Sequence, residues 1–308
     1  DAVKFQTFRP AAVVSERAPK AAYQRETTGA DQSQLEMLRS LVLPPEAHEE
    51  LQALCREQGV MFVSTPFDNG SVDLLHELDV PFIKIGSGEI TNLPFLVYVA
   101  NKRRPIVLST GMSTLIEVEE AIRTIERAGS GDLLLLHCVS NYPADPGDVN
   151  LRAMGTMADA WGYPVGYSDH TRGIAIALAA VAMGACVIEK HFTLDRHLPG
   201  PDHRASLEPE ELRQMVDGIR AVEAALGTGR KEPAKSEAEM RDLVRRSIVA
   251  AMDVEAGAVL TEEMLACKRP GTGLPPSMLP RVVGRRLREA VTADTLITRK
   301  MLEGDAHE

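Results

Sequence analysis

Two histidines, His170 and His191, each follow a short apolar run, and the two runs are neighbours along the chain. Adjacent strands of a sheet lie about 4.8 Å apart, so imidazoles at the ends of two such strands can reach one divalent metal ion. Two histidines without a cysteine partner leave coordination positions for water or substrate, which is typical of a catalytic metal site. The alternative is that each is a hydrogen-bonded core residue.

Two lysines, Lys4 and Lys84, lie inside runs that are expected to be strands buried on both faces. A buried ammonium costs several kcal/mol unless it meets an anion, so the pair indicates a bound phosphate or carboxylate. An internal ion pair with Glu89 or Glu189, or a Schiff-base lysine, is the alternative. Strand-end hydroxyls would add donors to the same anion: Ser87, Ser109, Ser140 and Ser168.

Glu89 ends the segment Lys84-Ile85-Gly86-Ser87-Gly88-Glu89. A carboxylate near a metal ion and a bound anion can move protons, which makes Glu89 a catalytic candidate. It can equally serve only to orient a lysine, so both roles stay open.

The other histidines and the cysteines are expected to be structural. His137 is predicted in the core, and surface or loop positions are predicted for His48, His76, His197 and His307. The four cysteines, Cys55, Cys138, Cys186 and Cys267, lack metal-type spacing. Cys138 and Cys186 lie in apolar runs, which predicts buried, reduced thiols in a cytoplasmic protein.

Short apolar runs alternate with longer helix-like stretches, which predicts βα units and a parallel sheet. No Gly-x-Gly-x-x-Gly follows the first run, so a dinucleotide-binding sheet is not indicated. We therefore predict an α/β fold, a (β/α)8 TIM barrel that lacks its first βα unit, with the strand ends gathered on one catalytic face. The seven predicted strands are Ala2–Thr7, Val60–Ser64, Phe82–Ile85, Ile106–Ser109, Leu133–Cys138, Val165–Tyr167 and Cys186–Glu189.

The last part of the chain differs from the rest. After the amphipathic segment Glu208–Leu226 comes a polar stretch rich in Gly and Pro, which is typical of a linker. We predict a catalytic barrel over residues 1–228, a linker over 229–244 and a small domain over 245–308.

The composition narrows the function. The 308 residues hold 34 basic and 44 acidic side chains, a net charge of −10. An acidic surface argues against nucleic-acid and anionic-membrane partners. No apolar run approaches the roughly 20 residues that span a bilayer.

With these residues assembled, the chain resembles the sialic acid synthase family, which condenses phosphoenolpyruvate with N-acylated mannosamine-type sugars. The likeness covers essentially the whole chain. The matching stretches are Val3-Lys4-Phe5-Gln6-Thr7-Phe8, Ser64-Thr65-Pro66-Phe67-Asp68, Lys84-Ile85-Gly86-Ser87-Gly88-Glu89, Leu108-Ser109-Thr110-Gly111-Met112, His137-Cys138-Val139-Ser140-Asn141-Tyr142-Pro143, Gly166-Tyr167-Ser168-Asp169-His170-Thr171, Glu189-Lys190-His191-Phe192-Thr193, Pro199-Gly200-Pro201-Asp202-His203 and Lys268-Arg269-Pro270-Gly271.

The resemblance implies a role for each matching residue. His170 and His191 would hold the metal, most typically Mn2+, with Mg2+ or Co2+ as alternatives, and Glu89 would lie beside the reacting carbon. The small domain would be an antifreeze-like (SAF) domain, which closes the partner's site in a domain-swapped homodimer. Phosphoenolpyruvate would be bound by Lys4, Thr65, Lys84, Ser87, Ser109, Ser140 and Ser168. The sugar would contact Gln6, Tyr142, Asp202 and, from the partner chain, Arg269.

The implied activity is an N-acetylneuraminate-type synthase acting on phosphoenolpyruvate and N-acetylmannosamine or a related sugar. A legionaminate-type synthase that uses a 2,4-diacetamido sugar is the first alternative. A lysine-dependent aldolase using Lys84 or Lys190, or an inactive sugar-binding or ice-binding remnant, is more distant. A segment usual at the start of this family is not matched here, so we expect this polypeptide to be less than fully active.

Overall fold

The computed structural model describes residues 1–21, 24–25, 28 and 32–304. The chain divides into two compact units, and the first ends at Gly227. The stretch predicted as a linker, 229–244, is not wholly irregular, because it holds the 3-10 turn η4 (Lys235–Glu237) and the helix α11 (Ala238–Val244).

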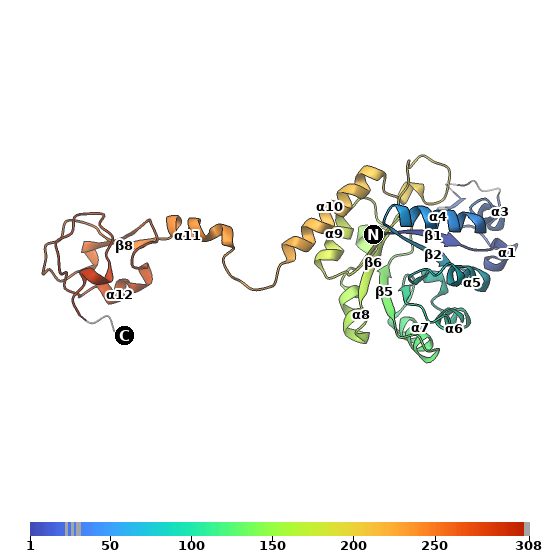
Figure 1. The fold of residues 1–308 in the computed structure, drawn as a ribbon, viewed down its shortest axis with the longest axis horizontal. Helices are drawn as coiled ribbons and strands as arrows, with labels where there is room; N and C mark the ends of the chain where they lie inside the picture. The colour runs from blue at the N-terminus through green and yellow to red at the C-terminus, as the bar shows by residue number, and fades with distance from the viewer. Residues whose placement is uncertain (22–23, 26–27, 29–31, 305–308) are drawn as a thin grey trace. The chain divides into compact units, whose positions relative to one another are not determined.

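The first unit contains seven parallel strands among its described residues, and helices surround them (Figure 1). Strands β1 and β2 pair with each other, and β3 to β7 form one sheet in chain order. Each strand lies within about two residues of its predicted position. The strands are β1 (Ala2–Thr7), β2 (Met61–Pro66), β3 (Ile83–Ile85), β4 (Ile106–Ser109), β5 (Leu133–Cys138), β6 (Val165–Asp169) and β7 (Ile188–Lys190).

Helices follow the strands, as alternating βα units require. Helix α7 shows how the sequence sets a helix start, because the hydroxyl of Thr114 and the carboxylate of Glu117 form a reciprocal capping box. The helices are α1 (Pro10–Val13), α3 (Gln34–Arg39), α4 (Pro45–Glu57), α5 (Asn69–Glu77), α6 (Leu93–Ala100), α7 (Leu115–Arg127), α8 (Ala153–Trp161), α9 (Ala175–Ala182) and α10 (Pro209–Leu226). Short 3-10 turns lie at η1 (Ser87–Glu89), η2 (Pro146–Asp148) and η3 (His203–Ala205).

Successive side chains of each strand point in opposite directions. One set packs against the surrounding helices, and the other set points away from them. Side chains such as Ile83, Ile85, Leu135 and Tyr167 are fully buried against the surrounding helices. Their strand neighbours point the other way, as the two-residue period of a strand dictates. Strand β1 is less buried than predicted, and the Lys4 side chain is 24% exposed.

Two predictions about histidines and cysteines are wrong. His48 is fully buried in α4, not on the surface, because its ring nitrogens lie 2.8 Å from Thr7 Oγ1 and 3.1 Å from the Pro44 oxygen. These partners remove most of the cost of burying an imidazole. Cys186 is exposed, since β7 begins only at Ile188.

The remaining structural expectations are met more closely. Cys138 is buried, and His76 and His197 are exposed. His137 is partly buried at the edge of the core, with Nε2 2.6 Å from the Val149 oxygen. The prediction for His307 lies outside the described residues.

The second unit has its own small core. Strands β8 (Ser247–Ala250) and β9 (Leu265–Lys268) pair antiparallel, and α12 (Leu279–Val282) follows. Its core includes Ile248, Leu287 and Ile297, all fully buried. Further 3-10 turns are η5 (Glu262–Met264), η6 (Pro276–Met278) and η7 (Arg299–Met301). Among the described residues of the whole chain, none of the helices has the length and apolar character needed to cross a bilayer.

Candidate active site

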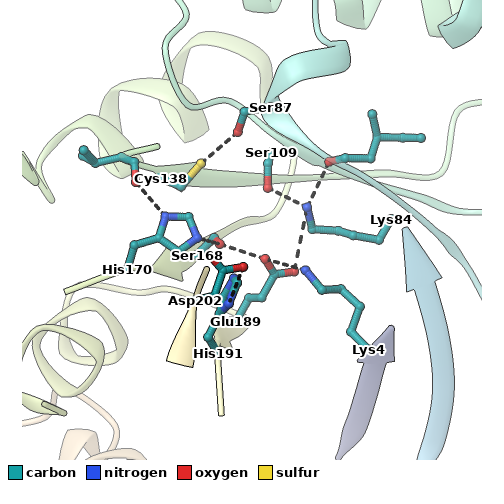
Figure 2. A network of polar contacts seen from close by, with 12 residues as sticks. Lys4, Lys84, Ser87, Ser109, Cys138, Ser168, His170, Glu189, His191 and Asp202 are labelled. Atoms are coloured by element: carbon teal, nitrogen blue, oxygen red, sulfur yellow. Dashed lines mark hydrogen bonds and ion pairs between the residues drawn. The ribbon is translucent and has the colours of Figure 1, made fainter. Parts of the chain in front are cut away.

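Polar side chains at and just after the carboxyl ends of the parallel strands lie together on one face (Figure 2). Residues paired in parallel strands share a face, so Gln6 lies beside Thr65, and Ser168 lies beside Glu189. The structure brings together Lys4, Lys84, Ser109, Ser168, His170 and Glu189 in one contact network.

Glu189 is the centre of this network. Its Oε1 lies 3.0 Å from Lys4 Nζ and accepts a hydrogen bond of 2.8 Å from Ser168, while its Oε2 lies 3.8 Å from Lys84 Nζ. Lys84 is 3% exposed and donates to Ser109 Oγ at 2.6 Å and to the Ile85 oxygen at 2.9 Å. The two predicted lysines therefore converge, and the anion between them is a carboxylate of the chain itself.

The charges of this centre depend on each other. Burial by itself would raise the pKa of Glu189, but Lys84 and Lys4 outweigh it and hold that pKa well below the usual range. Burial lowers the pKa of Lys84 to about 8, although Glu189 opposes the shift. At neutral pH the site thus holds two ammonium groups and one carboxylate, a net charge of about +1 that favours an anionic ligand.

A second group of donors lies around Gly111. The Gly111 amide donates to Ser87 Oγ at 3.0 Å, and Ser87 Oγ lies 3.1 Å from Cys138 Sγ. A Cβ atom built on Gly111 would lie 2.9 Å from Cys138 Sγ and from Ser87 Oγ, and closer still to Ser140 Oγ. Ser87 and Ser140 therefore lie close together around Gly111, whose lack of a side chain leaves room for their hydroxyls.

Thr65, on the same face, is 2% exposed, and its hydroxyl oxygen has no hydrogen-bond partner among the described residues. A buried hydroxyl without a partner is uncommon in folded proteins, because it forfeits the hydrogen bonds that water would supply. Thr65 is therefore available to bind a ligand.

The two predicted metal ligands lie side by side. The ring centroids of His170 and His191 are 5.5 Å apart, and the Tyr142 ring lies 4.2 Å from the first and 5.6 Å from the second. His170 Nδ1 lies 2.6 Å from the Val139 carbonyl oxygen. Because a carbonyl only accepts, Nδ1 carries the proton and the lone pair lies on Nε2.

These residues fit a divalent ion with open coordination positions. Burial lowers the pKa of His170 and of His191, so both rings are neutral at pH 7, the form that binds metals. The Val139 carbonyl fixes the His170 ring, as the outer partners of metal-bound histidines do. No cluster of three or more ligand-type side chains occurs among the described residues. An ion held by two histidines would take its other ligands from water or substrate.

Asp202 lies next to His191 and extends the site. Its Oδ2 lies 3.8 Å from His191 Nδ1, and its Oδ1 is buried without a partner among the described residues. Burial raises the pKa of this carboxyl. An unsatisfied buried oxygen next to the histidine pair suits a substrate hydroxyl or amide.

Glu89, Gln6 and Arg269, which were also predicted as site residues, have different surroundings. Glu89 is partly exposed and accepts a hydrogen bond of 2.7 Å from Asn92. Gln6 is exposed at the end of β1. Arg269 lies in the second unit, exposed just after β9, and its predicted role stays a prediction.

Sequence reasoning underestimated Glu189 and missed Cys138 as a site residue. Glu189 entered only as one of two ion-pair partners for the lysines, although it lies in strand β7, two residues before His191. The signal that identifies it is strand alternation, since Ser168 and Glu189 are paired in register. Cys138 has the same inward position in β5.

A cavity of about 630 Å³ lies beside this site, between the loops that follow β6 and β7. None of the predicted site residues lines it. It is bordered by Arg172, Gly173, Arg196, His197, Leu198, Pro199, Gly200, Arg204, Ala205, Ser206 and Glu211.

Comparison with known proteins agrees with this architecture. The chain is 48% identical to the N,N'-diacetyllegionaminic acid synthase of Legionella pneumophila, over 98% of this chain and 86% of the relative. It is 38% identical to the human N-acetylneuraminate-9-phosphate synthase, over 86% and 74%. A crystal structure of N-acetylneuraminic acid synthetase from Leptospira borgpetersenii, in complex with citrate, superposes with a TM-score of 0.66 at 34% identity, covering 78% of this chain and 79% of that one.

The fold and site define a TIM-barrel-like enzyme scaffold with a lysine-lined face at its strand ends, and the predicted barrel fold is confirmed. The NeuB family matches residues 1–231, and the SAF domain matches residues 245–303. The chain belongs to the NeuB family and carries a SAF domain at its C-terminal end, so the predicted resemblance is confirmed. Its relatives include synthases of nonulosonic acids.

Proposed function

We propose that this chain condenses phosphoenolpyruvate with the open-chain aldehyde of an N-acetylated amino sugar, forming a C–C bond. Carbon 3 of phosphoenolpyruvate attacks the aldehyde carbon, and water adds to the cation that forms at carbon 2. Phosphate then leaves from carbon 2 with its bridging oxygen, and the product is a nine-carbon 2-keto acid. The observation that carries this proposal is the convergence of two lysines and two neutral histidines on one strand-end face.

The lysines and hydroxyls suit the three-carbon donor. Phosphoenolpyruvate carries a carboxylate and a phosphate, which need cations and hydrogen-bond donors once water is displaced. Lys4, Lys84 and the hydroxyls around Gly111 provide both. Holding the donor at two ends fixes carbon 3 relative to the aldehyde, which is a direct source of rate enhancement.

Without substrate, Glu189 supplies the negative charge between the lysines. The donor's arrival would replace part of that contact and leave Glu189, hydrogen-bonded to Ser168, at the edge of the bound anion. From there its carboxylate can accept a proton from the attacking water. Glu89 remains the first candidate for this role, and comparing Glu89→Gln with Glu189→Gln separates the two.

The histidine pair is assigned to the sugar. We propose that His170 and His191 hold a divalent ion, Mn2+ in the first instance, which would polarise the sugar's aldehyde oxygen as a Lewis acid. Tyr142 lies against both rings, and Asp202 lies beside His191. These two side chains, with Gln6, would orient the sugar hydroxyls and acetamido groups.

Sequence similarity favours the 2,4-diacetamido sugar over N-acetylmannosamine. The chain is 48% and 47% identical to two N,N'-diacetyllegionaminic acid synthases and 38% identical to the human N-acetylneuraminate-9-phosphate synthase. We therefore propose that the product is of the legionaminate type, with N-acetylneuraminate synthesis as the alternative.

A paired-sugar assay tests both levels of this proposal. Purified enzyme with Mn2+ and phosphoenolpyruvate is given either sugar, and released phosphate and 2-keto acid are measured. A higher kcat/KM with the diacetamido sugar supports the finer assignment, and a higher value with N-acetylmannosamine reverses it. Absence of product with both sugars would refute the condensation.

One observation favours a second candidate, a lysine-dependent aldolase. The pKa of Lys84 is lowered to about 8, as suits a Schiff-base nucleophile. However, its ammonium is committed to Ser109, Ile85 and Glu189. Borohydride trapping with pyruvate decides, because a covalent adduct on Lys84 together with activity in EDTA would favour the aldolase.

We also propose a domain-swapped homodimer in which Arg269 of one subunit reaches the sugar in the site of the other. The exposed position of Arg269 in the SAF domain is compatible with this role.

A further inference from the structure

Asp169 in β6 and Lys190 in β7, the residues that precede the two histidines, form a buried ion pair. Lys190 Nζ lies 2.8 Å from Asp169 Oδ2, and the two side chains are 1% and 0% exposed. Each residue immediately precedes one of the histidines, His191 and His170, in the chain. The two are also partners in the register of β6 and β7.

Strand alternation places this pair on the face opposite to the substrate side. Ser168 and Glu189, one residue earlier in each strand, join the lysine network of the active site. Asp169 and Lys190 must then point toward the surrounding helices. Lys190 therefore has no access to a substrate and is not a Schiff-base candidate.

The pair is connected to the backbone around His170 on both sides. Asp169 Oδ1 accepts from the Thr171 amide at 2.9 Å, from Thr171 Oγ1 at 2.8 Å and from the Tyr167 hydroxyl at 3.4 Å. Lys190 also donates to the Thr171 carbonyl. The amide, hydroxyl and carbonyl of Thr171 are therefore all hydrogen-bonded to the pair. His170 lies between Asp169 and Thr171, so its backbone is held at both ends.

A buried ion pair contributes little net stability to the contact between two strands. Removing two charges from water offsets much of their attraction, and apolar replacements of similar size are often as stable or more stable. A buried pair with every partner satisfied instead specifies one register and one local geometry. The local geometry specified here is that of His170, which follows Asp169, and of His191, which follows Lys190.

We propose that the Asp169–Lys190 ion pair is a positioning device that sets the separation and orientation of the His170 and His191 imidazoles, and so determines affinity for the divalent ion. The inference rests on the proposed metal role of the histidines. It assigns Asp169, Thr171 and Lys190 to the outer support of that site, none of them touching substrate.

The test measures Mn2+ binding to the full chain. The free ion is quantified by its electron paramagnetic resonance signal. The double variant Asp169→Leu/Lys190→Met replaces the pair by apolar side chains and leaves no unpaired charge. We expect about 10- to 100-fold weaker Mn2+ binding, the usual cost of losing an outer support of a metal ligand. We also expect an unchanged or higher melting temperature in EDTA and a KM for phosphoenolpyruvate within about threefold of wild type, with kcat reduced.

Two further variants sharpen the result. Lys190→Arg keeps the charge and should restore most of the affinity. Asp73→Leu/Lys102→Met removes a more exposed pair between α5 and the end of α6, and should leave Mn2+ binding at the wild-type value.

Thr171→Val removes a single donor to Asp169 and tests the same support if the double variant does not fold. If the folded double variant binds Mn2+ with wild-type affinity, the inference is overturned while the metal role stands. If the double variant does not fold, wild-type Mn2+ affinity of Thr171→Val has the same consequence. Absence of Mn2+ binding by the wild-type protein would overturn the metal role, and the positioning role with it.

Discussion

The carboxylate of Glu189 lies 3.0 Å from the ammonium of Lys4, joining the last and the first of the seven parallel strands through their side chains. The same carboxylate also faces the ammonium of Lys84, which lies in the third strand, β3. An anion of the protein thus occupies the position between the lysines that the proposed function gives to an anion of the substrate.

Glu189→Gln should destabilise the fold, because it leaves Lys84 buried without a counter-charge. We expect a loss of about 3 kcal/mol in the free energy of unfolding, measured by urea denaturation at pH 7. Glu223→Gln is the matched control, since it breaks only the exposed pair with Arg220 and should cost less than about 1 kcal/mol. Equal effects of the two substitutions would show that the central carboxylate is not needed for stability.

Lys84 should give the enzyme an alkaline limit. Its pKa is lowered to about 8 by burial, so the group is cationic below that pH and neutral above it. The kcat/KM for phosphoenolpyruvate reports groups of the free enzyme and should fall about tenfold per pH unit above pH 8. A value that stays constant up to pH 10 would contradict the role of Lys84 in binding the donor.

The histidine pair should account for the metal requirement. His170→Ala and His191→Ala should each weaken Mn2+ binding by about 100-fold or more, since each removes one of two protein ligands. Activity lost in EDTA should return with Mn2+ in the wild-type enzyme and not in either variant. His76→Ala, at an exposed histidine of α5, should match the wild type. Full activity of either variant in EDTA would rule out the proposed metal site.

Gly111→Ala should impair donor binding specifically. The added methyl group would collide with Ser87, Cys138 and Ser140. We expect the KM for phosphoenolpyruvate to rise about tenfold, with the KM for the sugar little changed, because only the donor is proposed to contact these hydroxyls. Gly131→Ala is the control, as nothing lies within 4 Å of a Cβ atom there. A similar effect of both substitutions would leave the hydroxyls around Gly111 without a role in donor binding.

Subunit complementation tests the proposed domain swap. Arg269→Ala and His170→Ala should each be inactive alone, and refolding an equal mixture should restore about a quarter of wild-type activity, because half of the dimers contain one intact site. If Arg269 serves its own subunit, the mixture stays inactive.

The strands were predictable because their apolar runs are short and bounded by polar, glycine-containing ends. The convergence of Lys4, Lys84 and the two histidines followed from the same pattern, since parallel strands bring their carboxyl ends to one face. The central place of Glu189 was harder to see, because a single carboxylate in a strand gives no signal until its register with Ser168 is known.

The wrong predictions have a different origin. The burial of His48 depends on Thr7, 41 residues away in the sequence, which no local pattern reveals. The exposure of Cys186 depends on where β7 begins, and the ends of short apolar runs are poorly defined by the sequence alone.

The most direct measurement follows a 13C label from carbon 3 of phosphoenolpyruvate by NMR, with the purified enzyme, Mn2+ and the diacetamido sugar. The proposed condensation predicts that the label appears in a methylene group bonded to the former aldehyde carbon of the sugar. Recovery of the label only in the methyl group of pyruvate, or in unchanged phosphoenolpyruvate, would contradict it.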